Sequence, residues 1–162
     1  MDKSELILNG DGSVYHLKLK PENLSSKIIL VGDQFRVDKI TKHFEKIEFK
    51  VQNREFKSVT GYYNSNRITV ISTGIGSGNI DIVLNELDAL VNINLNTGEL
   101  NKSLKKLELI RIGTSGAIQN DIPVDSFLIS KMAIDVDGFL LNYDLANIDN
   151  TKFNNHIYKE HQ

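Results

Sequence analysis

The sequence predicts an α/β fold in which a mixed, mainly parallel central sheet is flanked by helices. Three short apolar runs rich in β-branched residues each end at a glycine turn, a pattern typical of buried strands that lead into loops. Helically spaced apolar residues follow two of these turns, so strand, turn and helix alternate along the chain. Ligands of such folds bind outside the carboxyl ends of the parallel strands, so we expect the three turns to open on one ligand-binding edge.

The first strand, turn and helix unit occupies residues 27–44. Its strand is Lys27–Val31, its turn is Gly32 and Asp33, and its helix is residues 36–44. Apolar residues at helical intervals indicate the helix, and Asp33 is well placed to cap its start.

Antiparallel strands follow this helix. Apolar and polar residues partly alternate over residues 46–52 and 55–63, and a tight polar turn at residues 64–66 leads into a central strand over residues 68–71. These segments make the predicted sheet a mixed one.

The second strand, turn and helix unit contains the glycine-rich segment GIGSG at residues 74–78. The apolar face of residues 80–91 predicts a helix, with Asn79 as its N-cap. Residues 92–106 are polar with weak periodicity, which predicts an exposed loop with room for a short helix.

The third apolar strand covers residues 107–112 and ends at a glycine turn over residues 113–116. A further short strand is predicted at residues 127–130, and the polar, asparagine-rich end at residues 147–162 is expected to fray. No internal repeat or interdomain linker is visible, so residues 1–162 are predicted to form a single domain.

Composition excludes several classes of protein. Hydrophobic residues at 40% and charged residues at 25% are typical of a globular domain rather than a disordered chain or a coiled coil. The net charge of −2 provides no basic field for nucleic acid or an anionic membrane, and the absence of cysteine excludes disulfides, thiol catalysis and cysteine-ligated metals. With no secretory signal pattern and no apolar run of membrane-spanning length, we expect a cytoplasmic protein that binds a small molecule or another protein.

The glycine turns favour an anion over a dinucleotide. The fingerprint G-x-G-x-x-G requires glycine where Asn79 stands, and Asn94 occupies the acidic position expected about 20 residues later. The lysine motif of P-loop proteins is also absent from the sequence. Glycine nevertheless lets backbone N–H groups approach an anion, and helix N-termini attract negative charge, so these turns suit phosphate.

Arginine is scarce in this chain, which makes its positions informative. Only Arg36, Arg54, Arg67 and Arg111 are found among the 19 basic residues, and Arg36 and Arg111 lie beside glycine turns. The guanidinium fork binds phosphate bidentately, although an ion pair that anchors its strand is an alternative for Arg111. Arg54 has Glu55 as a neighbouring partner for an ion pair, and Arg67 is expected to be solvated.

Hydroxyl and imidazole groups give weaker signals. Thr114 and Ser115 follow the third strand, where they either bond a ligand or cap the turn. The four histidines show no spacing of a metal-ligand cluster, and surface packing is the ordinary interpretation of His16.

In combination, these segments resemble the nucleoside phosphorylase family, and most closely its uridine phosphorylase branch. The motifs follow one another in the family's order and extend to about Gly138. They are YHL at residues 15–17, VGDQFRVDKI at 31–40, NREF at 53–56, STGIGSGNI at 72–80 with EL at 86–87, and IRIGTSGAIQNDIPVDSFLIS at 110–130.

The resemblance implies phosphorolysis, in which inorganic phosphate as co-substrate cleaves a pyrimidine nucleoside such as uridine into the free base and ribose 1-phosphate, without an organic cofactor. By similarity, phosphate is held by Gly32, Arg36, Arg111 and Thr114, with Arg54 supplied by the neighbouring subunit. Arg111 and Thr114 are the residues to which the resemblance gives catalytic roles. A nucleoside hydrolase of the same fold is the nearest enzymatic alternative, but hydrolysis uses water and needs no phosphate cluster.

The resemblance also implies an assembly, either a homodimer or a homohexamer built as a trimer of dimers. His16 would reach the ribose in the neighbouring subunit's site. A potassium ion would lie near Glu55 at the dimer interface, where Asn79 stands in place of the family's serine.

Two departures from the family bear on function. Gln34 replaces the proline of the GDPxR loop, which removes a residue that fixes the backbone φ. Family members also continue past this chain with the segments that bind the base and the ribose hydroxyls, so the resemblance covers an amino-terminal portion.

The alternative to an enzyme is a non-catalytic remnant that binds phosphate or a full-length relative. The partial sheet also predicts self-association or marginal stability.

Overall fold

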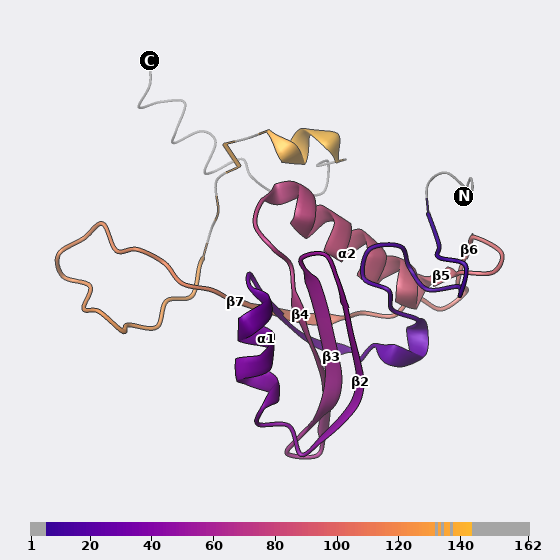
Figure 1. Ribbon diagram of the computed structural model, residues 1–162. Helices are drawn as coiled ribbons and strands as arrows, with labels where there is room; N and C mark the ends of the chain where they lie inside the picture. Colours follow the sequence, from indigo (N-terminus) through magenta and orange to yellow (C-terminus); the bar gives the residue numbers. More distant parts are fainter. Residues whose placement is uncertain (1–5, 132, 134, 137, 144–162) are drawn as a thin grey trace. The chain divides into compact units, whose positions relative to one another are not determined.

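The computed structural model describes residues 6–131, 133, 135, 136 and 138–143 of the 162-residue chain. The chain divides into two compact units between Gly116 and Ala117. The described part of the first unit holds the sheets and the α-helices, and the described part of the second holds one short 3-10 helix (Figure 1).

The main sheet of the first unit has five strands. They are β1 (Lys27–Val31), β2 (Lys46–Asn53), β3 (Phe56–Tyr63), β4 (Asn66–Ser72) and β7 (Glu108–Ile112). Their order is β2-β3-β4-β1-β7, in which β1 pairs in parallel with both β4 and β7, while β2, β3 and β4 form an antiparallel meander. The predicted mixed sheet is therefore confirmed, and its first strand has the predicted bounds.

Helices cover both faces of this sheet. They are α1 (Gln34–Thr41) and α2 (Ser77–Asn92). Successive side chains of a strand point to opposite faces, so Ile28 packs in a cluster with Val83 of α2, whereas Val31 packs in another with Val37 of α1. Both flanking helices are present as predicted, but α1 spans Gln34–Thr41 rather than residues 36–44. Asp33 caps α1 as expected, by accepting a hydrogen bond from the backbone N–H of Phe35.

The segment before β1 completes the α2 side of the core. Val14, Leu17 and Leu19 are at most 1% exposed there, and Leu8 pairs with Val14 in an isolated antiparallel bridge. Burial of one such aliphatic side chain stabilises the fold by about 1.5 to 3 kcal/mol. A turn of 3-10 helix, η1 (Pro21–Asn23), connects this segment to β1.

The start of α2 differs from the prediction. The helix begins at Ser77 and has Gly76 as its N-cap, with φ at 100°. Glycine tolerates this positive φ, which allows the chain to turn into the helix before Asn79. Asn79 is therefore not the N-cap; it lies inside the helix, where its amide donates to the carbonyl of Ile75 at 3.1 Å.

The polar segment after α2 is also more ordered than predicted. Instead of a plain loop it forms a two-stranded hairpin, β5 (Ile93–Asn94) and β6 (Glu99–Leu100). The buried amide of Asn92 accepts from the backbone N–H of Lys105 at 2.7 Å and so ties the end of the segment to the helix. Short-range asparagine bonds thus supply the order that apolar periodicity does not predict.

In the second unit, the strand predicted at residues 127–130 is absent, and these residues are coil. Phe127 and Ile129 are exposed by 103% and 96%, and no strand among the described residues pairs with this apolar run. The 3-10 helix η2 (Phe139–Asn142) follows, and the predicted frayed end at residues 147–162 lies outside the described residues. None of the helices described is both long and apolar enough to cross a membrane.

Candidate functional site

The carboxyl ends of three parallel strands meet at one edge of the sheet. Val31 of β1 is in register with Ser72 of β4 and Ile112 of β7, so the turns that follow these strands lie side by side. A Cβ at Gly32 would lie 3.8 Å from Nη2 of Arg111 and 3.9 Å from the carbonyl oxygen of Gly74. A longer side chain at Gly32 would fill the space between the turns, which glycine leaves open.

Two arginines and a threonine hydroxyl converge on this space. Nη2 of Arg36, from the first turn of α1, lies 3.5 Å from Oγ1 of Thr114. Arg111, near the end of β7, brings its guanidinium against Gly32 and Gly113. The structure therefore brings together Gly32, Arg36, Arg111 and Thr114, which are the four residues that this chain was expected to contribute to its own phosphate site.

The guanidinium groups of this cluster have no carboxylate partner among the residues that the structure describes. The ion pairs among the described residues involve Arg67 and not Arg36, Arg54 or Arg111. The alternative in which Arg111 anchors its strand through an ion pair therefore finds no partner in the described chain. Guanidinium groups that have no carboxylate partner in the described part of the chain make this edge electropositive, which is the property that an anion-binding site requires.

Arg54 lies at the same edge, on the turn between β2 and β3. It adopts φ of 54°, its side chain is exposed, and its carbonyl accepts a hydrogen bond from Nε2 of Gln34 at 2.5 Å. Gln34 in turn accepts from Nε2 of Gln52 at 2.8 Å. The amide that replaces the family's proline thus ties the first residue of α1 to the turn that carries Arg54.

Glu55 and Asn79 meet at Gly74, the glycine that follows β4. Gly74 has φ of 70°, and a Cβ there would lie 2.6 Å from Nδ2 of Asn79 and 3.0 Å from Cγ of Glu55, so a larger residue would clash. The pair offers a carboxylate and an amide oxygen, the donor types that hard cations such as potassium prefer. The described residues hold no cluster of three or more acidic or histidine side chains that could hold a metal ion.

His16 lies next to the end of β2 and is held by Glu86, which the sequence analysis named as part of a family motif but to which it gave no role. Its carbonyl accepts from Nδ2 of Asn53 at 2.8 Å, and its ring nitrogen Nδ1 lies 2.7 Å from Oε1 of Glu86. Glu86 was detectable in principle, because it is a charged residue on the apolar face of the predicted helix, between Val83 and Leu87.

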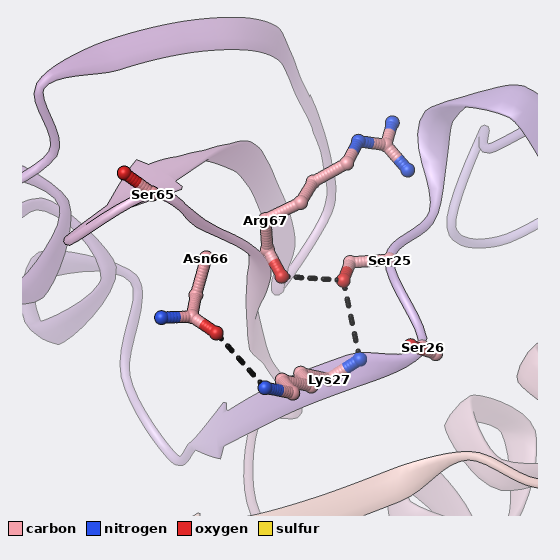
Figure 2. Close-up of a pocket in the computed structure, with 6 residues that line it drawn as sticks. All are labelled: Ser25, Ser26, Lys27, Ser65, Asn66 and Arg67. Atoms are coloured by element: carbon pink, nitrogen blue, oxygen red, sulfur yellow. Dashed lines mark hydrogen bonds between the residues drawn. The ribbon is translucent and has the colours of Figure 1, made fainter.

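The opposite end of the sheet has a polar pocket of about 330 Å³ (Figure 2). Lys27 there donates to Asn66 at 2.9 Å, and Ser25 donates to the carbonyl of Arg67 at 2.7 Å. The guanidinium of Arg67 points away from the pocket and bonds Glu48 and two carbonyls of the η1 segment. Arg67 is therefore not solvated as predicted, and its bond lowers the pKa of Glu48 below the usual range.

Another ion pair, separate from that between Arg67 and Glu48, joins α1 to the sheet. Nζ of Lys57, a residue only 7% exposed on β3, lies 2.5 Å from Oδ2 of Asp38 on α1. The hydrogen bond from Lys57 lowers the pKa of Asp38 below its ordinary value. This pair stabilises the element from which Arg36 projects.

Comparison with known proteins identifies the family. The family model described as the phosphorylase superfamily matches residues 26–157. The chain is 32% identical over 133 residues to the uridine phosphorylase of Thermococcus kodakarensis and 35% identical over 127 residues to that of Haemophilus influenzae, which covers 82% and 77% of this chain. A crystal structure of a Trypanosoma brucei nucleoside phosphorylase that shows uridine phosphorylase activity matches 73% of this chain with a TM-score of 0.67 and 36% identity.

The match is partial on the relatives' side. The chain spans 43% and 45% of the length of the two uridine phosphorylases and 41% of the Trypanosoma brucei chain. Residues 26–157, which the family model matches, contain Gly32, Arg36, Arg111 and Thr114. Because the family model matches residues 26–157, which are most of this chain, the chain belongs to the phosphorylase superfamily.

Proposed function

We propose that this chain binds inorganic phosphate at the carboxyl edge of its sheet and takes part in the phosphorolysis of uridine. The single observation that carries this proposal is the cluster of Arg36, Arg111 and Thr114 around the open turn at Gly32, where neither guanidinium has a carboxylate partner among the described residues. A phosphate dianion would accept bidentate bonds from both arginines and neutralise their mutual repulsion.

The chemistry proposed for this site is displacement at the sugar. A phosphate oxygen forms a bond to the anomeric carbon while the bond from that carbon to the base nitrogen breaks, and the bonding electron pair leaves with the base. The products are ribose 1-phosphate and uracil. Arg111 and Thr114 would orient the attacking phosphate below the ribose, whose positive charge in the transition state the phosphate stabilises. Phosphate is already an anion, so no general base is required.

Assembly and cation binding are further parts of the proposal. The Arg54 side chain is exposed and forms no ion pair with the described residues. This supports a homodimer, or a trimer of such dimers, in which Arg54 and His16 serve the neighbouring subunit's phosphate and ribose. Potassium would bind the oxygens of Glu55 and Asn79 at that interface. We propose that this protein acts in nucleoside salvage in the cytoplasm.

Release of uracil from uridine by the purified chain, measured with and without inorganic phosphate, tests the proposal. We expect release that requires phosphate and yields ribose 1-phosphate, with guanosine as the comparison for base preference. Equal release without phosphate would indicate a hydrolase. No release from a folded chain that still binds phosphate would favour the non-catalytic alternative and contradict the phosphorylase assignment.

A further inference from the structure

Glu86 is a buried carboxylate whose hydrogen bonds all come from one short segment. It lies on α2 within the apolar core and is 7% exposed. Oε1 accepts from the backbone N–H of His16 at 2.9 Å, and Oε2 accepts from the backbone N–H of Leu17 at 2.8 Å. Burial of a carboxylate is costly unless its oxygens are hydrogen bonded, so these donors are needed for Glu86 to be tolerated in the core.

The same carboxylate determines which ring nitrogen of His16 carries the proton. Nδ1 lies 2.7 Å from Oε1 of Glu86, and an ionised carboxylate only accepts hydrogen bonds, so Nδ1 carries the proton. In the neutral ring Nε2 is then the unprotonated nitrogen. The ring is also held edge-on by Tyr15 at 4.9 Å and by Phe56 at 6.2 Å between centroids.

Nε2 is left for a ligand. The His16 side chain is 26% exposed, and no described residue forms a hydrogen bond with Nε2. We propose that Glu86 is a positioning residue that holds His16 with Nε2 directed outward as a hydrogen-bond acceptor for a sugar hydroxyl. This inference rests on the proposed function for its ligand, the ribose of a nucleoside, whereas the fixed tautomer of His16 follows from the contacts within this chain.

A structural role for Glu86 would require only its bonds to the backbone, so the test must observe the ring itself. The ¹⁵N-labelled full chain is examined at about pH 8.5, above the usual range of imidazole titration, by long-range proton–nitrogen correlation. The signals of His16 are identified by their loss in His16→Phe, which keeps a packed ring. We expect protonated Nδ1 and unprotonated Nε2 in the wild type.

Glu86→Gln keeps the shape of the side chain but offers one carbonyl oxygen to three donors. We expect this variant to shift His16 toward the Nε2-protonated tautomer, while the matched control Asp88→Asn, on an exposed position of the same helix, leaves it unchanged. A wild-type ring protonated at Nε2, or a Glu86→Gln spectrum identical to the wild type, would overturn the proposal.

Steady-state kinetics of uridine phosphorolysis give a second test of the positioning role. Glu86→Gln should raise the KM for uridine about tenfold, the effect of one hydrogen bond, and change the KM for phosphate less than twofold. In the His16→Phe background Glu86→Gln should add nothing further, because the two residues act through one contact. Additive effects would contradict the positioning role. An inactive wild type would refute the proposed function, and the spectrum of His16 would still decide whether Glu86 fixes its ring.

Discussion

The guanidinium of Arg111 is the side chain on which the proposed anion site most depends. It lies beside the open turn at Gly32 and has no carboxylate partner among the described residues, so its charge is available to a ligand. Arg111→Ala should weaken phosphate binding by about 2 to 4 kcal/mol, in line with the loss of a preorganised charge stabiliser.

Isothermal titration of phosphate into the wild type and the variant measures this change. Arg111→Lys is the matched control, because lysine keeps the charge but lacks the bidentate fork, and its loss should be smaller. A folded Arg111→Ala variant with wild-type phosphate affinity would show that Arg111 does not belong to the site.

Asp38 provides a pH-dependent contribution to stability. Its pKa is lowered below 3.8 mainly by the hydrogen bond from Lys57, so folding favours the ionised form. Stability from a lowered carboxyl pKa is present above the unfolded value and is lost as the pH falls through the folded value. The side chain of Asp38 is 50% exposed, so the effect is modest.

Asp38→Asn should therefore lower the thermal midpoint at pH 7, because Lys57 loses its partner. The difference from the wild type should shrink as the pH is lowered past 3.8 and Asp38 becomes protonated in both states. Thermal unfolding followed across this range measures the difference, and a difference that is constant with pH would exclude the ion pair as its cause.

At the scale of elements, β7 is an edge strand with apolar side chains in solvent. Leu109, Ile110 and Ile112 are exposed by 40%, 66% and 47%, and β1 is the strand with which β7 pairs among the described residues. Unpaired apolar edges promote association between chains. We expect Ile110→Lys, which places a charge on this edge, to reduce association beyond the dimer.

Sedimentation velocity over a dilution series measures this association. Ile118 is an exposed residue of the second unit, so Ile118→Lys is a control for the effect of an added charge away from β7. A wild-type chain that sediments as a clean monomer at every concentration and unfolds in a sharp, reversible transition would contradict both the edge effect and the proposed dimer.

At the scale of the whole molecule, the sequence predicts best where local signals and packing agree. Lys27–Val31 is a strand because its apolar run is buried on both faces, and Asp33 caps α1 as its position before the helix predicts. Residues 127–130 have the same apolar character, but no strand in the described part of the chain lies beside them, and strand formation depends on such a neighbour rather than on composition alone. The order of residues 92–106 comes from asparagine bonds, which leave no apolar pattern.

The candidate site also has features that the sequence predicts and features that it does not. The alternation of strands and glycine turns predicted that the turns open on one edge, with Arg36 and Arg111 near it, and the parallel register of β1 with β4 and β7 agrees with this. The full set of Gly32, Arg36, Arg111 and Thr114 came from the family resemblance. The partner of Arg67 could not be predicted, because Glu48 lies 19 residues away on β2, with β3 between it and β4 in the sheet. The contact between His16 and Glu86 joins positions 70 residues apart, and only the fold shows it.

The central claim is that this chain binds inorganic phosphate at the carboxyl edge of its sheet. The most direct measurement is isothermal titration of inorganic phosphate into the purified full chain, with chloride at equal ionic strength as the reference. The account predicts saturable binding of phosphate that is lost in a folded Arg36→Ala, Arg111→Ala double variant. Absence of saturable binding to the folded wild type, or binding that persists in the double variant, would contradict it.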